Sequence, residues 1–361
     1  MKALVAHALN SIRVEDVTLE PPKAQEVHVR MVAAGVCHSD VSAVNGTIPN
    51  VFPCVLGHEG AGVVIGVGDG VTNCKPGDHV VMSFVPNCGR CFHCVRNEAY
   101  LCKATPRGGM MTDGTARLRL GDKPLAAFLS LGNMAQEVVC PAMNIVPIPK
   151  DIPLKVAALI GCGVTTGVGA AINTAKVAPG STVAVFGCGG VGLAAIQGAR
   201  IAGAARIFAV DVSAEKLETA KKFGATDGVL ADAAVKHIVA ETQGIGVDYA
   251  FEVIGNPAVV EAAISATRRG GTTVAVGVGK LADSIKVNAL AFPLMGKTLC
   301  GCMFGSANPQ HDFPKLLALY KAGKLDLDSM VSRTYTLDES PQAFADLEKG
   351  GTNARGVIVF D

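Results

Sequence analysis

From residue 182 onward the sequence alternates between strand-like and helix-like segments, and this alternation constrains the fold most strongly. Strands are indicated at 182–187, 206–211, 246–255 and 271–278, with helices between them at 190–204, 213–225 and 256–270. Such an alternation predicts a parallel sheet with helices on both faces. The fold class is therefore α/β with a doubly wound parallel sheet.

The turn after the first strand reads GCGGVG, which fits the G-x-G-x-x-G pattern through Gly187, Gly189 and Gly192. The pattern alone is weak in a chain with 42 glycines, but a strand precedes it, a helix follows it, and Asp211 ends the next strand. This arrangement is typical of a Rossmann dinucleotide site, where a helix N-terminus binds pyrophosphate and the carboxylate binds ribose hydroxyls. Asp211 repels a 2′-phosphate and the next two residues supply no cation, so NAD is favoured over NADP. A glycine-rich turn that binds nothing is the alternative.

The residues before this region have a different texture and predict a second domain. Segments such as EVHVRMVAAGV and PGDHVVMSF show short apolar alternations broken by turns, which predict an antiparallel, barrel-like β domain. After residue 306 we expect helices at 309–322 and 340–348 and a strand at 355–361. We therefore expect a β domain at 1–163, a nucleotide domain at 164–306, and a return of 307–361 to the first domain, since 361 residues exceed one ordinary core.

Four cysteines lie close together in and after the stretch NCGRCFHC. Their spacing is C-x2-C-x2-C-x7-C, through Cys88, Cys91, Cys94 and Cys102. Four thiolates fill the tetrahedral shell of Zn²⁺ at ~2.3 Å and leave no position for a substrate. The motif therefore predicts a structural zinc that closes the loop at 86–104. Free or redox-paired thiols and an iron–sulfur cluster are the alternatives.

A dispersed group of residues offers a second metal site. Cys37 lies in GVCHSD, His58 in LGHEG and Cys162 in IGCGVTTG. Each taken alone reads as a buried thiol or core histidine. Two thiolates and one imidazole are the ligand type of a catalytic zinc that keeps its fourth position open. Spacing alone does not find this set.

The charge balance and the hydropathy of the chain indicate which partners and which cellular compartment to expect. Lys plus Arg number 32 and Asp plus Glu 31, so nothing favours nucleic acid or an anionic membrane, and a small-molecule partner is expected. Uncharged stretches at 156–175 and 177–199 reach the length of membrane spans, but their Gly, Thr, Ser and Asn favour buried strands and loops. The N-terminus lacks a secretory signal, and the 12 cysteines are expected as thiols or ligands in a cytoplasmic protein.

Several stretches together resemble one known family. AAGVCHSD, FPCVLGHEGAGVV, CGRCFHC with Cys102, and IGCGVTTGVGAAINTAKVAPGSTVAVFGCGGVG are similar to the zinc-dependent medium-chain alcohol dehydrogenases. The resemblance extends over essentially the whole chain and is strongest to the long-loop branch of liver-type and glutathione-dependent formaldehyde dehydrogenases. It implies a GroES-like β-barrel catalytic domain beside the Rossmann domain, NAD as cofactor, two Zn²⁺ per chain and a homodimer.

The resemblance also implies roles for individual residues. Cys37, His58 and Cys162 would bind the catalytic zinc. Catalytic roles near it are implied for His38, Ser39, Asp40 and Glu59. In these roles Glu59 is an occasional ligand or neighbour, Asp40 orients the histidine ring, and Ser39 passes the alcohol proton outward. The implied cofactor contacts are Gly187, Gly189, Gly190, Gly192, Asp211, Thr166, Arg355 and His38. Phe84 would line the substrate pocket, together with Ile48.

One position departs from the liver-type pattern. The proton relay of that type ends at a histidine three residues beyond the serine, and here Ser42 occupies the position. A serine is no base near neutral pH, so proton exit would run through ribose hydroxyls, water or His38.

The expected function is reversible zinc-dependent oxidation of a primary aliphatic or aromatic alcohol to the aldehyde, with hydride transfer to NAD. A thiol-dependent formaldehyde dehydrogenase, acting on S-hydroxymethyl glutathione or mycothiol, is the alternative. Because fold does not fix substrate, polyol oxidation and double-bond reduction stay open, and so does a non-catalytic role.

Overall fold

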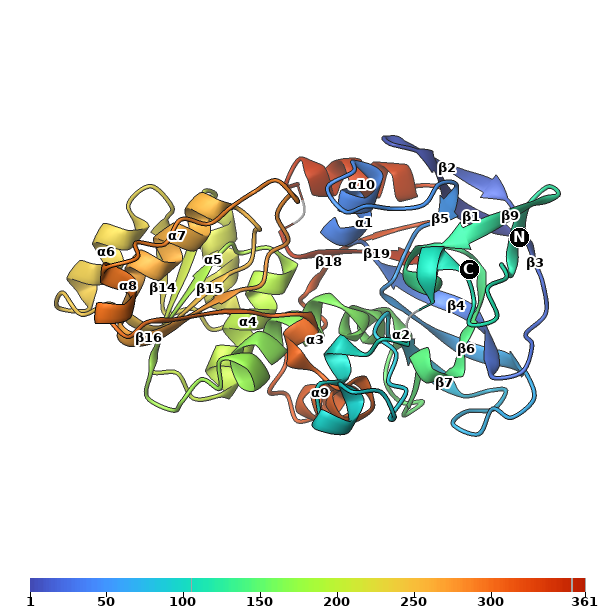
Figure 1. Ribbon diagram of the computed structural model, residues 1–361, viewed down its shortest axis with the longest axis horizontal. Coiled ribbons are helices and arrows are strands. Elements are labelled where there is room, and N and C mark those ends of the chain that lie inside the picture. Colours follow the sequence, from blue (N-terminus) through green and yellow to red (C-terminus); the bar gives the residue numbers. More distant parts are fainter. Residues whose placement is uncertain (105, 352, 361) are drawn as a thin grey trace. The chain divides into compact units, whose positions relative to one another are not determined.

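The computed structural model describes residues 1–104, 106–351 and 353–360. Contacts divide the chain into two compact units, each with its own sheets (Figure 1). Unit 1 comprises Met1–Gly163, Asn308–Ala322 and the chain from Leu327 onward, and unit 2 comprises Val164–Ala307 and Gly323–Asp326. The last segments of the chain therefore belong with the first.

Unit 1 contains two sheets. The first has the order β2-β1-β5-β9-β8-β3, with bounds Ser11–Asp16, Lys2–Ala8, Cys54–Val55, Lys123–Ala127, Leu118–Leu120 and Thr18–Leu19. The second has the order β11-β7-β6-β4-β19-β18, with β10 also on β4, and bounds Ile145–Ile148, His79–Met82, Gly60–Val67, Glu26–Gly35, Arg355–Val359, Val331–Tyr335 and Glu137–Pro141.

Most strand pairs in unit 1 are antiparallel, as the sequence predicts, but two pairs are parallel. These are β5 with β9 and β18 with β19. The helix α10 (Ser340–Glu348) lies between β18 and β19 in the chain, and a helical connection of this kind joins parallel neighbours. The expected antiparallel arrangement is therefore wrong for β5 with β9, whereas β18 and β19 lie in the returning segment, for which no strand direction was predicted.

Strand β4 is central to unit 1. It pairs with β6, β10 and β19, and Val27, Val29 and Met31 on it are buried in the core. At its end the chain passes through Cys37 into α1 (His38–Val44). The remaining helices are α2 (Leu154–Ala157) and α9 (Pro309–Lys321). The helices expected at 309–322 and 340–348 are thus present as α9 and α10.

Unit 2 has one parallel sheet of order β14-β13-β12-β15-β16-β17. Its strands, from β12 to β17, are Thr182–Phe186, Arg206–Asp211, Asp227–Leu230, Val247–Glu252, Thr267–Ala275 and Thr298–Gly301. Its helices, from α3 to α8, are Gly163–Gly169, Gly190–Ile201, Ala214–Lys222, Ala234–Glu241, Pro257–Ala266 and Ala291–Leu294. This confirms the predicted Rossmann fold. The order reverses between β12 and β15, and ligands of such sheets bind at the carboxyl ends of the strands there.

Four elements of unit 2 were not predicted, namely α3, β14, α6 and α8. The expectation of buried strands and loops at 156–175 is wrong, because α3 and the turns on either side of it make this stretch helical. β14 has a single buried side chain, Val229, and α6 has no side-chain hydrogen bond at its N-cap, so the pattern and capping signals are weak. A further difference lies after α7, where the helix was expected to reach residue 270. Thr267 has extended backbone angles and starts β16 instead.

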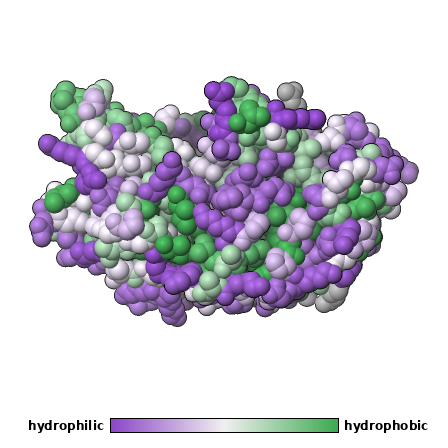
Figure 2. Space-filling model, turned by 90° about the horizontal axis from the view of Figure 1, so that it is seen from below, coloured by the Kyte–Doolittle hydropathy of each residue, from purple (hydrophilic) through white to green (hydrophobic). Residues whose placement is uncertain are grey.

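Among the described residues, no single helix is long and apolar enough to cross a membrane. Only 154–161 and 163–174 reach that length and composition, as a pair bent by 57°. Figure 2 shows one face of the molecule, on which hydrophilic side chains alternate with scattered apolar clusters.

Candidate active site

Four side chains from three distant segments of the sequence meet inside unit 1. One ligand atom from each of Cys37, His58, Glu59 and Cys162 lies within 4.8 Å of the others, and all four residues are buried. Cys37 follows β4, His58 and Glu59 lie between β5 and β6, and Cys162 follows a short helical turn at Ala158–Gly161. The structure therefore brings together the three predicted ligands and the residue expected beside them.

The imidazole of His58 is held on one side and available on the other. Its Nδ1 lies 3.0 Å from Oδ2 of Asp40, and Oδ1 of Asp40 accepts a hydrogen bond from the Gly57 amide at 2.8 Å. Burial disfavours the charged ring, but the Asp40 carboxylate and Cys37 raise the pKa of His58 well above its usual value. Both ring nitrogens are buried without a hydrogen-bond partner among the described residues, and of the two Nδ1 has the ion-pair contact with Asp40. An orphaned imidazole nitrogen of this kind fits a metal ligand.

The two thiols of the cluster act on each other. The hydrogen bond from Cys162 lowers the pKa of Cys37 well below its usual value, although burial opposes it. The same contact, with burial, raises the pKa of Cys162 well above its usual value. Zn²⁺ binds thiolate, and two thiolates with one imidazole leave a position open for substrate. The residues present therefore fit a catalytic zinc.

Glu59 forms a buried ion pair with Arg355 inside unit 1. Nη2 of Arg355 lies 2.6 Å from Oε1 of Glu59, and the amide of Gly163 donates to Oε2 at 3.3 Å. A side chain at Gly35 would overlap the Glu59 carboxylate, so glycine provides the space. Burial raises the pKa of Glu59 to about 7, and Arg355 opposes the rise. Arg355, predicted from the resemblance to contact pyrophosphate, is thus engaged by Glu59.

The other predicted residues of unit 1 lie around this cluster and at α1. The Sγ atom of Cys37 lies 3.7 Å from Oγ of Ser39. The ring of Phe84 meets His58 edge to face, with centroids 5.5 Å apart. Ile48 is half-buried and donates its amide to the Ser42 carbonyl at 2.9 Å, while His38 is exposed at the start of α1.

One aromatic residue of this site was not predicted. Phe128 meets the His58 ring edge to face, with centroids 5.6 Å apart. No spacing pattern connects residues 58 and 128, and Phe128 stands within the mainly apolar stretch PLAAFLSLG, so no sequence signal singled it out. Phe84 and Phe128 together give the imidazole an apolar surround.

The cysteines at 88, 91, 94 and 102 form the second cluster of unit 1. Their sulfurs lie within 4.8 Å of one another, and the pairs Cys88–Cys94 and Cys91–Cys102 are each 3.9 Å apart. A tetrahedron with Zn–S bonds of ~2.3 Å has sulfurs about 3.8 Å apart. The backbone amides of Cys94 and Lys103 lower the pKa of the Cys91 thiol to about 6, which favours a thiolate there. This cluster fits a closed zinc shell.

The glycine turn of unit 2 has the backbone that a dinucleotide needs. Gly187 has a φ of +103°, and a Cβ at Gly192 would overlap the Gly187 carbonyl. Gly189 is the N-cap of α4, whose first residue is Gly190. At the end of β13, Asp211 accepts hydrogen bonds from the amides of Cys188 at 2.8 Å and Ser213 at 3.0 Å. The carboxylate is therefore fixed beside the turn.

Two further residues bear on this turn. Lys216 on α5 lies close enough to lower the pKa of the Cys188 thiol, which burial and Asp211 raise to about 12. Lys216 lies beyond the two residues after Asp211 on which the expected preference for NAD rests. Thr166, predicted to lie near the nicotinamide, is half-buried in α3 of unit 2.

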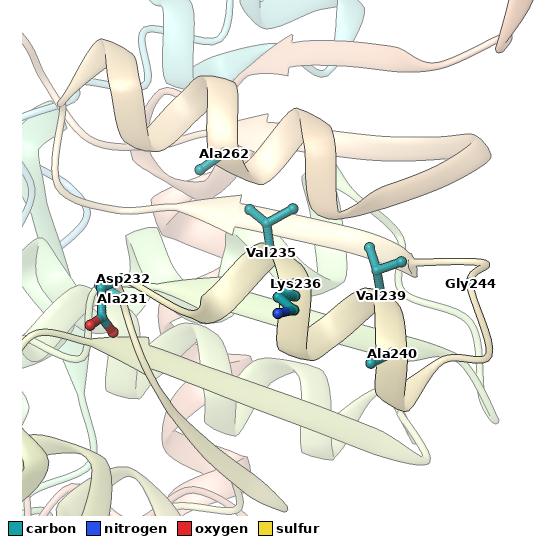
Figure 3. A pocket seen from close by; sticks show the side chains of 8 residues that line it. All are labelled: Ala231, Asp232, Val235, Lys236, Val239, Ala240, Gly244 and Ala262. Atoms are coloured by element: carbon teal, nitrogen blue, oxygen red, sulfur yellow. The ribbon is translucent and has the colours of Figure 1, made fainter.

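A pocket of about 720 Å³ lies elsewhere in unit 2 (Figure 3). It is lined by α6, the turns before and after it, and Ala262 of α7, and its charged side chains are Asp232 and Lys236. None of the predicted site residues lines it.

Comparison with known proteins covers both units. Residues 23–150 match the family described as alcohol dehydrogenase GroES-like domain, and residues 190–322 match zinc-binding dehydrogenase. Alcohol dehydrogenase class-3 of Myxine glutinosa is 40% identical, over 99% of this chain and 97% of that protein. Alcohol dehydrogenase B of Mycobacterium tuberculosis H37Rv is 42% identical, over 96% and 94%. The crystal structure of benzyl alcohol dehydrogenase from Acinetobacter calcoaceticus has a TM-score of 0.94 at 32% identity, over 100% and 99%.

Proposed function

The chain belongs to the zinc-dependent medium-chain alcohol dehydrogenase family, and we propose that it oxidises a primary aliphatic or aromatic alcohol to the aldehyde with NAD. The observation that carries this proposal is the convergence of Cys37, His58 and Cys162 within 4.8 Å, with Nε2 of the imidazole unpartnered. The reaction is reversible, since hydride transfer between alcohol and nicotinamide runs in both directions.

The proposed chemistry divides between the metal and the side chains. When bound by Cys37, His58 and Cys162, Zn²⁺ supplies a Lewis acid that makes loss of the hydroxyl proton easier. Asp40 keeps the His58 ring oriented through the 3.0 Å contact with Nδ1. Ser39 takes the proton from the alcohol and passes it on. Since Ser42 is no base, the proton leaves through water, ribose hydroxyls or His38.

The proposed cofactor site is the glycine turn of unit 2 with the N-terminus of α4. Free amides there and the positive end of the helix dipole bind pyrophosphate, while Asp211 accepts hydrogen bonds from the ribose. Thr166, His38 and Arg355 are proposed as further cofactor contacts. Phe84 and Ile48 are proposed to line the substrate pocket.

A thiol-dependent formaldehyde dehydrogenase is the second candidate, and the 40% identity with a class-3 alcohol dehydrogenase favours testing it. The likeness to a benzyl alcohol dehydrogenase favours the aromatic branch of the first candidate. NADH formation would be measured with ethanol, longer alkanols, benzyl alcohol, and formaldehyde with and without glutathione or mycothiol. Turnover of free alcohols supports the first candidate, and turnover only with formaldehyde and a thiol supports the second. No turnover with any of them would contradict both.

Asp211→Ala is expected to weaken NAD binding and relax the preference over NADP. The affinity for NAD should fall about tenfold or more, because a hydrogen bond to a charged group contributes about 1.5–3 kcal/mol. The measurement is kcat/KM with both nucleotides, and Asp232→Ala, an exposed carboxylate of the same unit, is the control. Unchanged selectivity in Asp211→Ala would mean that another residue, such as Lys216, discriminates between the nucleotides.

A homodimer is proposed through the outer edge of β17, which ends the sheet of unit 2. Near it, Leu290 and Leu294 are 73% and 74% exposed, an unusual state for large apolar side chains. Sedimentation should give twice the mass of the chain, and Leu294→Glu should shift it towards monomer. A monomeric or tetrameric wild-type protein would contradict the proposal.

We also place the enzyme in the cytoplasm. Both cysteine clusters need reduced thiols to bind metal, and a reducing compartment maintains them.

A further inference from the structure

Asn133 is buried and its polar side-chain atoms are unused. Its exposed fraction is 0%, and neither Oδ1 nor Nδ2 has a hydrogen-bond partner among the described residues. A carboxamide in this state has lost its hydrogen bonds to water without replacement, which costs stability. A leucine of similar shape would fill the same volume without that cost. The presence of an amide here therefore calls for a role other than packing.

The amide lies against the loop that carries two of the four clustered side chains. A Cβ at Gly57 would be 2.5 Å from Oδ1 of Asn133, and a Cβ at Gly60 would be 2.5 Å from Nδ2. These glycines bracket His58 and Glu59, and their missing side chains make room for the carboxamide. The hydrogen in the Cβ direction of Gly57 faces Oδ1, in the manner of a weak Cα–H···O contact.

Main-chain hydrogen bonds hold the Asn133 side chain in this place. The amide N–H of Asn133 donates to the Gly57 carbonyl at 3.1 Å, and that of Met134 donates to Leu56 at 2.9 Å. The chain at 133–134 is therefore tied to the chain that enters the loop. On its far side, the Glu59 carbonyl accepts from the Gly35 amide of β4 at 2.7 Å.

The segment that presents Asn133 is strained. Leu129 and Ser130 have φ values of +52° and +59°, which side chains rarely adopt. The same segment places Phe128 on the edge of the His58 ring. Strain of this kind persists where the surrounding structure enforces it and gathers at functional sites. It is a second observation, independent of the buried amide, and points to the same loop.

We propose that Asn133 is a positioning residue that fixes the 57–60 loop and so sets where His58 and Glu59 present their ligand atoms. The two glycines give this loop conformational freedom, which would leave the metal ligands that it carries poorly positioned. The Asn133 carboxamide, which lies against both glycines, restricts that freedom. Asn133 does not touch the reacting atoms. The inference rests on the proposed zinc-dependent function, because positioning matters only if the cluster binds metal.

The test compares Asn133→Leu with the zinc-loaded wild type. Stability, measured as Tm, should be unchanged or higher, since an unsatisfied amide is replaced by an apolar group of similar shape. The zinc held by Cys37, His58 and Cys162 should be released to a chelator about tenfold faster. The kcat should fall about tenfold, with a smaller change in KM. Effects of this size are typical of groups that support metal ligands. The Co²⁺-substituted variant should show a changed absorption spectrum, because that spectrum reports ligand geometry.

Two further variants keep the test decisive. Ser130→Ala removes another buried, unpartnered polar group of the same segment, one that is not among the nearest neighbours of Gly57 or Gly60. It should leave the Co²⁺ spectrum and zinc release unchanged. If Asn133→Leu does not fold, Asn133→Ala is measured in the same way, because it removes the amide without adding volume.

Two results would overturn the proposal. One is a wild-type Co²⁺ spectrum and zinc release rate in the folded Asn133 variant, and the other is a loss of kcat that only follows a fall in Tm. Failure of the proposed function looks different, since a wild-type protein without zinc or turnover would contradict it whatever residue 133 does.

Discussion

Replacing Cys162 with serine is expected to abolish turnover while leaving the protein folded. The thiol is one of the two sulfurs in the buried cluster with His58, and a serine hydroxyl does not replace a soft thiolate ligand. Lewis-acid stabilisation is worth several kcal/mol, so kcat/KM should fall at least about a thousandfold. The measurements are NADH formation, zinc content, which should drop from about two to about one per chain, and Tm, which should change little.

Cys140→Ser is the matched control for this variant. Cys140 is also fully buried in unit 1 but belongs to neither cluster. It should keep both zinc ions and its turnover. Near-normal activity in Cys162→Ser would refute the proposed catalytic site, however well the rest of the chain matched its family.

Replacing Cys91 with serine is expected to lower the stability of the protein and not the turnover of its folded fraction. Its sulfur lies 3.9 Å from that of Cys102, and an incomplete shell forfeits the folding energy that comes with metal binding. A loss of a few kcal/mol would lower Tm by about 5–10 °C in a domain of this size. The loop at 86–104 should become sensitive to protease, and expression should fall.

The two cysteine variants should lose different zinc ions. Cys91→Ser should keep the catalytic ion, so its remaining folded fraction should still oxidise alcohol, whereas Cys162→Ser should keep the structural ion and its stability. Cys74→Ser, a thiol of unit 1 outside both clusters, controls for the loss of a sulfur. A Cys91→Ser protein with unchanged Tm and two zinc ions would show that the four cysteines do not form a metal shell.

Local patterns in the sequence were enough to predict much of unit 2. The strands β12 and β13 each contain a continuous apolar run of four residues, and β15 is mainly apolar. Helices α4 and α5 follow β12 and β13, with glycine or serine at their N-caps. β14 was not predicted because an edge strand with one buried side chain carries little hydrophobic pattern. α6 was not predicted because no side chain caps its N-terminus. In unit 1, the parallel pair β5–β9 joins residues some seventy positions apart, and no local signal reports such a pairing.

The sequence alone determined the four-cysteine cluster, because its members lie within one short loop and their spacing already limits how far apart the sulfurs can be. The glycine turn with Asp211 is determined in the same way, by one strand, one turn and one helix. Only the tertiary structure decided that Cys37, His58, Glu59 and Cys162 meet, that Arg355 engages Glu59, and that Asn133 lies against Gly57 and Gly60. These residues come from segments joined by long stretches of chain. The packing of β4, β6 and β19 in one sheet brings together the segments of Cys37, His58, Glu59 and Arg355. Hydrogen bonds from the Asn133 amide to Gly57 and from the Gly163 amide to Glu59 join the other two segments to them.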